Sequence, residues 1–273
     1  MTADGGGRKA YYLGQFRENR RAILDCGALG FDPSIPGCPG WDVVALIGHM
    51  ARVYTFWLKW VTERPRGFSR EAFAEIVAGR EARLPGFSVW MDAGFPKDSR
   101  PSGLMEVAEQ SGDELDAALT VLQPDEEVWT FVPGRQNGAF VFRRICMETT
   151  VHRVDAEEAH GIFRPIESEL ARDGIDEMLM MYREDPGYAE QSAGNRTGQT
   201  VLLRESSGPG RWLVTFNGEM ISVSEVEGPA DVTVSGSASD LMLFTQGRRA
   251  ARDLQVDGDR TIAEAWADLA GRF

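Results

Sequence analysis

Two histidines and one glutamate stand where they could bind a metal together. Glu148 and His152 are four residues apart on a predicted helix, so their side chains project from one face, one turn apart. Such a pair supplies two ligands for a divalent metal, and in helical bundles further ligands come from a facing helix. His49 is the third candidate, because it shares a stripe with Leu46 and Val53 and is expected to point into the bundle.

This donor set has a chemistry of its own. Two imidazoles and one carboxylate suit Zn²⁺, and they leave a fourth tetrahedral position for water or substrate. The alternative is that the histidines are hydrogen-bonded core residues and that Glu148 belongs to a surface pair. The chain has three histidines, and two of them are expected to face inward, one of them a turn away from a carboxylate. That coincidence favours a metal site. The third, His160, stands at a predicted helix end and is expected to be structural.

The elements that must position these residues are helical. Apolar residues at helical spacing predict helices over the first two thirds of the chain, and Asp42 is a plausible N-cap for the helix that carries His49. The helix that carries Glu148 and His152 is expected to end at Gly161, after a hairpin-like segment that contains Asn137-Gly138. The predicted helices cover residues 11–27, 41–60, 71–83, 102–122, 142–160 and 166–183.

The pattern changes near residue 199 from helical to strand-like. Residues 185–199 are rich in Gly, Ser, Asn and Pro and are expected to form a linker, and Asn217-Gly218 predicts a hairpin turn. We therefore expect an α+β protein: a four-helix bundle within residues 1–185 and a smaller α+β domain over 199–273. Its predicted strands cover 200–204, 212–216, 221–226, 231–235 and 254–256, and its helices 238–246 and 261–270.

Composition excludes several classes of protein. The formal net charge of −13 argues against a broad nucleic-acid surface, which needs clustered Lys and Arg. The sequence contains no stretch of about 18 apolar residues, the length that a membrane-spanning helix would need. Residues 1–9 lack the apolar segment of a signal peptide, so we expect a cytoplasmic protein. Cys26, Cys38 and Cys146 form no Cys-x-x-Cys pair, and we expect reduced, buried thiols.

Several segments resemble the actinobacterial, mycothiol-dependent maleylpyruvate isomerase family, which has a DinB-like helical domain. The likeness extends from about residue 11 to 270. It is carried by CPGWDV at residues 38–43 with Gly48-His49, ETTVHRVDAE at 148–157, ADVTVSG at 230–236, Gly247-Arg248, and LQVDGD at 254–259.

The resemblance implies a cofactor and a set of site residues. It implies that His49, Glu148 and His152 bind zinc, and that mycothiol places its sulfur on the open metal position. It also implies a sterol-carrier-like C-terminal domain with an arginine that meets the carboxylate of the substrate. Arg248 is the best match for that arginine, and the adjacent Arg249 is the alternative.

These inferences predict a thiol-dependent metalloenzyme that acts on a small electrophile. A free thiol has a pKa of about 8.5, and metal coordination would generate the nucleophilic thiolate. If the thiolate adds and later leaves after bond rotation, the result is cis–trans isomerisation; if it stays, the result is S-transfer. The alternatives are maleylpyruvate isomerase proper, or a small-molecule binding protein with a vestigial metal site.

Neighbouring residues receive weaker predictions. Asp155, three residues after His152, could orient the imidazole, form a salt bridge with Arg153 or face solvent. Arg153 itself is expected on the helix surface or at a contact between domains rather than in catalysis. Cys38 is expected to serve packing, and Trp41 to belong to the core or to a pocket wall.

Overall fold

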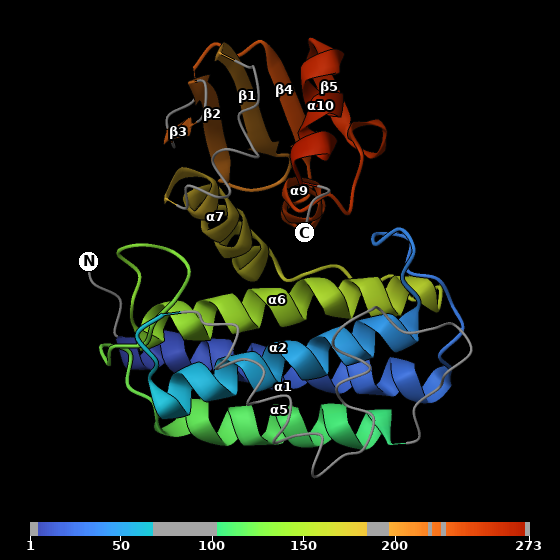
Figure 1. Cartoon of the computed structure of the whole chain (residues 1–273). Coiled ribbons are helices and arrows are strands. Elements are labelled where there is room, and N and C mark those ends of the chain that lie inside the picture. Colours follow the sequence, from blue (N-terminus) through green and yellow to red (C-terminus); the bar gives the residue numbers. More distant parts are fainter. Residues whose placement is uncertain (1–4, 68–102, 185–196, 218–219, 225–227, 271–273) are drawn as a thin grey trace. The chain divides into compact units, whose positions relative to one another are not determined.

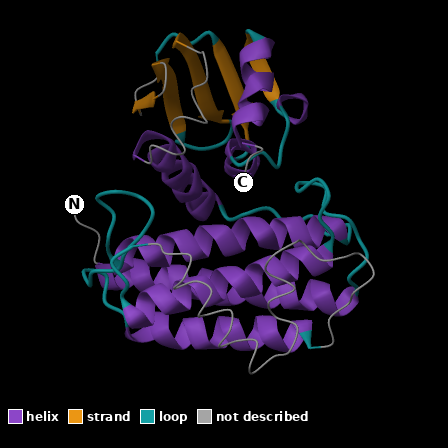
Figure 2. Cartoon of the chain, viewed as in Figure 1, coloured by secondary structure: helices purple, strands orange, loops and turns teal. Residues whose placement is uncertain are grey.

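The chain forms two compact units, Met1–Phe163 and Arg164–Phe273 (Figures 1 and 2). The first unit is helical, and the smaller second unit combines helices with a mixed sheet, which confirms the predicted α+β class. None of the described helices is long and apolar enough to cross a membrane. The structure is a computed structural model that describes residues 5–67, 103–184, 197–217, 220–224 and 228–270.

The described residues of the first unit form a four-helix bundle. Helix α1 packs against α6 and α5, and α2 packs against α5 and α6. Each of these helices was expected from the spacing of apolar residues, but the helix predicted over 71–83 lies outside the described residues. The bundle consists of α1 (Gly5–Leu29), α2 (Val43–Glu63), α5 (Leu104–Val121) and α6 (Gly138–Ala159).

Side-chain caps fix where the two helices of the candidate site begin. The carboxylate of Asp42 accepts a hydrogen bond from the backbone N–H of Ala45 at 2.9 Å, as the predicted N-cap of α2 should. Helix α6 begins at Gly138, four residues earlier than predicted, because the side chain of Asn137 accepts from the backbone N–H of Phe140 at 3.0 Å. The Asn-Gly pair therefore caps a helix here.

Helix α6 is enclosed on most of its surface. Most of its residues are buried, including the charged side chains of Arg144, Arg153, Asp155 and Glu157. A buried charge is costly unless it is paired and hydrogen-bonded. The partners of these side chains therefore decide what α6 can do.

The second unit is built on a mixed sheet with the order β3-β2-β1-β4-β5. Strands β1 and β4 are parallel, and the other neighbours are antiparallel. Strands β2 and β3 pair antiparallel on either side of the predicted Asn217-Gly218 turn, with Asn217 opposite Met220. The strands are β1 (Thr197–Glu205), β2 (Arg211–Asn217), β3 (Met220–Ser224), β4 (Val232–Gly236) and β5 (Gln255–Gly258).

Helices α9 (Ala238–Thr245) and α10 (Arg260–Ala270) pack against this sheet. The indole of Trp266 lies in their shared core, with ring centroids 5.8 Å from Phe244 and 6.0 Å from Phe216. A short 3-10 helix, Ala251–Asp253, precedes β5.

The boundary between the units lies earlier than the sequence analysis places it. Helix α7 (Ser168–Glu184) packs against α9 and β3 and so belongs to the second unit, whereas the prediction assigned residues up to 185 to the bundle. Helical periodicity shows that a helix has an apolar face, but not which neighbour covers that face. Here the cover includes Met242 of α9, whose side chain lies over Gly174.

Candidate metal centre

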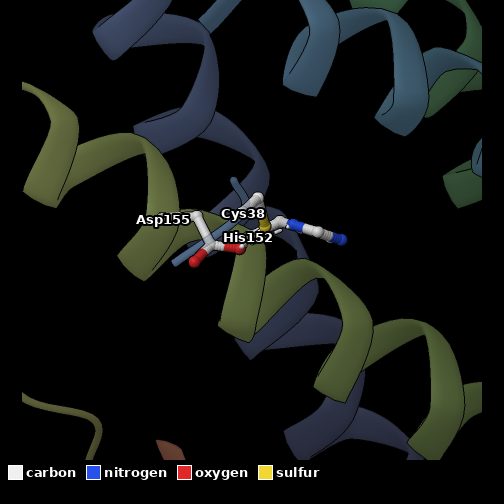
Figure 3. Close-up of side chains that lie close together, drawn as sticks. All are labelled: Cys38, His152 and Asp155. Atoms are coloured by element: carbon white, nitrogen blue, oxygen red, sulfur yellow. Dashed lines mark hydrogen bonds and ion pairs between the residues drawn. The ribbon is translucent and has the colours of Figure 1, made fainter. Parts of the chain in front are cut away.

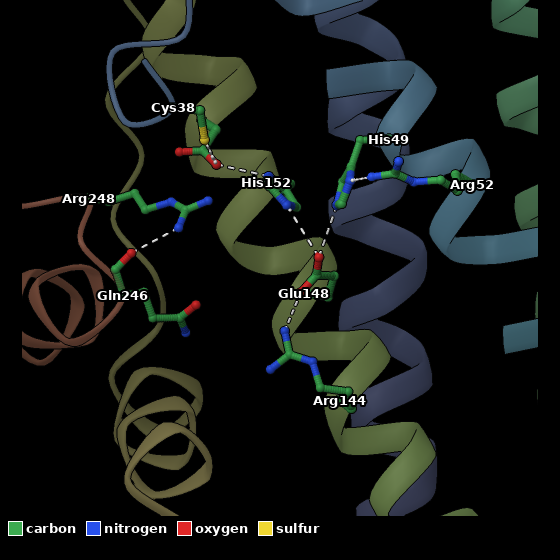
Figure 4. A network of polar contacts seen from close by, with 9 residues as sticks. Cys38, His49, Arg52, Arg144, Glu148, His152, Gln246 and Arg248 are labelled. Carbon is green, nitrogen blue, oxygen red and sulfur yellow. Dashed lines mark hydrogen bonds and ion pairs between the residues drawn. The ribbon is translucent and has the colours of Figure 1, made fainter. Parts of the chain in front are cut away.

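Helices α2 and α6 bring the three predicted ligands together (Figure 4). The Nε2 atom of His49, on α2, lies 3.1 Å from Oε1 of Glu148, on α6. The Nε2 atom of His152 lies 3.3 Å from the same oxygen. The ligand atoms of all three residues lie within 4.8 Å of one another. The two imidazoles thus meet at one carboxylate oxygen.

The donor set fits a zinc ion. Four tetrahedral ligands at Zn²⁺ bond lengths of about 2.0–2.2 Å lie roughly 3.3–3.6 Å apart. The contacts of 3.1 and 3.3 Å between Glu148 and the two imidazoles are close to that spacing. His49 and Glu148 are partly exposed and His152 is buried, so the cluster reaches the surface of the bundle from within. Metal binding by these residues stays a prediction.

His152 lies between two carboxylates. Its Nδ1 atom lies 2.9 Å from Oδ2 of the buried Asp155, and its Nε2 atom faces Glu148. Burial disfavours the charged ring, but the hydrogen bonds to Asp155 and Glu148 outweigh it and raise the pKa of His152 above its usual value. A metal-binding histidine commonly donates its other N–H to a carboxylate in this way. Asp155 therefore orients the ring, one of the three roles considered for it.

The Nδ1 atom of His49 is paired with a cation, whereas that of His152 is paired with a carboxylate. The His49 atom lies 2.9 Å from Nη2 of Arg52, and a guanidinium donates hydrogen bonds but accepts none. Nδ1 is therefore the acceptor, and the ring carries its proton on Nε2, which donates to Glu148. Burial is the main cause that lowers the pKa of His49 to about 4, so the ring is neutral near pH 7.

Glu148 is held at both oxygens. Oε1 accepts from the two histidines, and Oε2 forms an ion pair with Arg144, one turn earlier on α6. Burial works against the carboxylate charge, but Arg144 and the two histidines hold the pKa of Glu148 well below its usual range. Sequence reasoning missed both Arg144 and Arg52, although their spacings of i−4 from Glu148 and i+3 from His49 were available as signals.

Cys38 lies close to His152 and Asp155 and extends this network beyond Asp155 (Figure 3). Its Sγ atom lies 3.6 Å from Oδ2 of Asp155, and both residues are buried. Cys38, His152 and Asp155 are also close enough to form a metal group of their own. The two groups share His152, whose neutral ring has one nitrogen lone pair to offer, so they are alternatives. The group that contains Glu148 supplies two imidazoles and is the better zinc site.

Trp41 lies against both imidazoles. Its ring is stacked on that of His152 with an interplanar angle of 8° and a centroid distance of 6.1 Å, and its centroid lies 5.0 Å from that of His49. The indole, which was expected in the core or a pocket wall, therefore forms a wall of the candidate site.

Two family profiles match this chain. The profile of the mycothiol maleylpyruvate isomerase N-terminal domain matches residues 16–157, and that of the MDMPI C-terminal domain matches residues 169–265. The chain belongs to this family. The membership agrees with the resemblance carried by residues 38–43 and 148–157.

Solved structures show that the fold of the family extends over both units. A crystal structure of mycothiol-dependent maleylpyruvate isomerase is similar with a TM-score of 0.58 and 18% identity, over 91% of this chain and 92% of that chain. A histidine-to-alanine mutant of a mycothiol-dependent maleylpyruvate isomerase is similar with a TM-score of 0.57, at the same identity and coverage. At this identity the likeness establishes the fold. A comparison with curated proteins gave no match.

Arg153, within the matched family motif, has a structural place. It is buried in the bundle, where Nη1 donates to Oε2 of Glu157 at 2.7 Å and Nε donates to Oδ1 of Asn19 at 3.1 Å. The expectation of a charge on the helix surface was therefore wrong. Asn19 on α1 supplies this partner, and no feature of α6 alone points to it.

Arg248 and Arg249 follow α9 in the second unit of this family member. The Nη1 atom of Arg248 donates to the carbonyl oxygen of Gln246 at 2.9 Å (Figure 4), and Nε of Arg249 lies 3.6 Å from Oδ1 of Asp240. Both arginines are partly exposed. Their role toward a substrate stays a prediction.

Proposed function

We propose that this chain is a mycothiol-dependent enzyme that isomerises the double bond of a small, carboxylated electrophile, with Zn²⁺ bound by His49, Glu148 and His152. One observation carries the proposal: two imidazoles from different helices meet at a single oxygen of Glu148. Membership of the mycothiol maleylpyruvate isomerase family supports the choice of thiol and of reaction.

The surrounding residues have distinct tasks in this proposal. When bound, Zn²⁺ would lower the pKa of a coordinated thiol, so that the thiol loses its proton to solvent near neutral pH and is available as a nucleophilic thiolate. Asp155 fixes the orientation of His152, because it accepts from the ring nitrogen that faces away from Glu148. Trp41 covers one side of the two imidazoles and limits the approach of water.

The residue proposed to bind the carboxylate of the substrate belongs to the second unit. We propose that Arg248 binds the substrate carboxylate, since a guanidinium can hold it with two parallel hydrogen bonds, and that Arg249 is the alternative. Arg248→Ala should then raise the KM for a carboxylated substrate and lower turnover. Arg248→Lys should restore part of the loss, because it keeps the charge without the planar fork. The same pair of variants at Arg249 decides between the two positions.

The first test measures metal and activity together. Purified protein loaded with Zn²⁺ should contain about one ion per chain and, with mycothiol, convert maleylpyruvate to its trans isomer. His49→Ala and His152→Ala should lose both the ion and the activity, since each removes a ligand. His160→Ala is the matched control, because the third histidine is the C-cap residue of α6 and lies outside the cluster.

The fate of the thiol separates the possible functions. Isomerisation leaves the mycothiol concentration unchanged over many turnovers, whereas S-transfer consumes one thiol for each product formed. A protein that holds stoichiometric zinc and consumes mycothiol would be an S-transferase. A protein that binds small molecules without zinc would be a binding protein, and the proposal would then fail.

A further inference from the structure

The two oxygens of Glu148 have different partners. Oε1 contacts the Nε2 atoms of both histidines, and Oε2 is engaged by the guanidinium of Arg144. Arg144 and Glu148 stand four residues apart on α6, so the arginine approaches the carboxylate from the preceding turn. The side chain of Arg144 is 9% exposed and that of Glu148 is 24% exposed, so water competes little for this contact.

We propose that Arg144 is a positioning residue that restricts Glu148 to one metal-binding oxygen, and thereby keeps a metal position open for an external thiol. The inference rests on the proposed function, because it concerns the metal that His49, Glu148 and His152 would bind. A carboxylate can ligate a metal through one oxygen or through both. With Oε2 held by Arg144, Oε1 is the oxygen left to join the two imidazoles.

The number of ligating oxygens would determine how readily the site accepts a thiol. Two imidazoles and one oxygen make three protein donors, which is the count of catalytic zinc sites that keep an open position. A second oxygen from Glu148 would occupy the fourth position, so that a thiol could bind only if the coordination expanded to five. Arg144 reaches the candidate site through its bond to Glu148.

A merely structural ion pair makes a different prediction. If Arg144 only stabilises α6, its removal should lower both stability and metal affinity. If it restricts Glu148, its removal should leave metal affinity equal or higher, because Oε2 becomes a ligand, while thiol affinity falls. Arg153 offers a matched control, since it is also buried on α6 and pairs with an acid four residues away, Glu157, outside the metal cluster.

The experiment uses the zinc-loaded full chain and its Arg144→Met, Arg144→Lys and Arg153→Met variants at pH 8. Chelator competition measures zinc affinity, calorimetry measures mycothiol affinity, and a crystal structure of the zinc-loaded protein shows which Glu148 oxygens bind zinc. Wild type should show one near oxygen from Glu148. Arg144→Met should show two oxygens from Glu148 and bind mycothiol about tenfold more weakly, the low end of the usual cost of losing an outer partner. Its zinc affinity should be undiminished, because the metal gains a ligand atom. Arg144→Lys should restore one oxygen, and Arg153→Met should change stability but neither affinity.

Each result decides something. Two Glu148 oxygens on zinc in wild type, or an unchanged oxygen count with unchanged thiol affinity in Arg144→Met, would overturn the inference while leaving the proposed function intact. A wild-type protein that binds no zinc would instead overturn the proposed function. Because wild type is itself informative, the test survives even if Arg144→Met fails to fold.

Discussion

The Oδ2 atom of Asp155 lies 2.9 Å from the Nδ1 atom of His152, on the side of the ring away from Glu148. Asp155 is 2% exposed, and its side chain also contacts Cys38. A buried carboxylate in this place fixes the tautomer and the rotation of the ring, so that Nε2 points at Glu148. The orientation of His152 is therefore set before any metal binds.

Removal of that carboxylate should weaken the metal site without removing a ligand. Asp155→Ala is expected to lower zinc affinity by about 10- to 100-fold, the range found for outer partners of metal-binding histidines. Chelator competition measures the change. Glu157→Gln is the control, since Glu157 is a buried acid of the same helix that pairs with Arg153 instead. Equal zinc affinities in wild type and Asp155→Ala would show that Asp155 does not orient His152.

Arg52 should have the opposite effect on zinc affinity from Asp155. Its hydrogen bond to Nδ1 of His49 stabilises the tautomer with a proton on Nε2, the nitrogen that must bind the metal. Metal binding at Nε2 of a neutral ring puts the proton on Nδ1, where two donors would then face each other. Arg52→Met should therefore raise zinc affinity by about tenfold, if a hydrogen bond of roughly 1.5 kcal/mol is no longer broken.

Nitrogen NMR of the imidazoles checks this directly. Metal-free wild type should show His49 protonated on Nε2, and the zinc form should show it protonated on Nδ1. Arg52→Lys keeps a charged donor and should behave as wild type does. Weaker zinc binding in Arg52→Met, or a proton already on Nδ1 in the metal-free protein, would refute this reading of the contact.

The sequence predicted the cluster of candidate ligands better than it predicted the partners of those residues. His49, Glu148 and His152 could be selected because residue type and spacing along a helix are local properties. The partner of Arg153 could not, because Asn19 lies on α1 and meets α6 through tertiary packing. The roles of Arg52 and Arg144 depend on which rotamer each adopts, and spacing alone does not determine a rotamer.

The same distinction explains the errors in the fold. Asp42 was identified as a cap because its type and its place before an apolar stripe are visible in sequence. Asn137 was assigned to a hairpin-like segment, since Asn-Gly is a common turn signal, and an isolated antiparallel bridge does join it to Glu127. Its side chain nevertheless caps α6. When a residue type suits both a turn and a helix cap, the surrounding packing determines which of the two roles it takes.

The cap of α2 gives a stability prediction. Asp42→Ala should lower the free energy of unfolding of the helical unit by about 1 kcal/mol, because the backbone N–H of Ala45 loses its acceptor. Asp42→Asn, which retains an acceptor oxygen, should lose much less. The urea midpoint of the far-UV circular dichroism signal measures both. An Asp42→Ala midpoint equal to that of wild type would mean that the cap contributes nothing to α2.

Zinc binding should depend on pH through His152. The hydrogen bonds to Asp155 and Glu148 raise its pKa above the usual value, so the metal-free ring keeps its charge, and the proton on Nε2, to a higher pH than an ordinary imidazole does. The metal must displace that proton. His49, with its pKa lowered to about 4, and Glu148, with its pKa well below the usual range, are already deprotonated near neutral pH and contribute no further proton.

The proton on His152 determines the direction in which zinc affinity changes with pH. As pH falls below the pKa of His152, zinc affinity should drop about tenfold per pH unit, with a slope of one proton, and above that pKa it should level off. Calorimetry in two buffers of different ionisation enthalpy should give close to one proton released per zinc at low pH and fewer at high pH. A slope of two between about pH 5 and 6 would mean that His49 is also protonated, contrary to its neutral place beside Arg52.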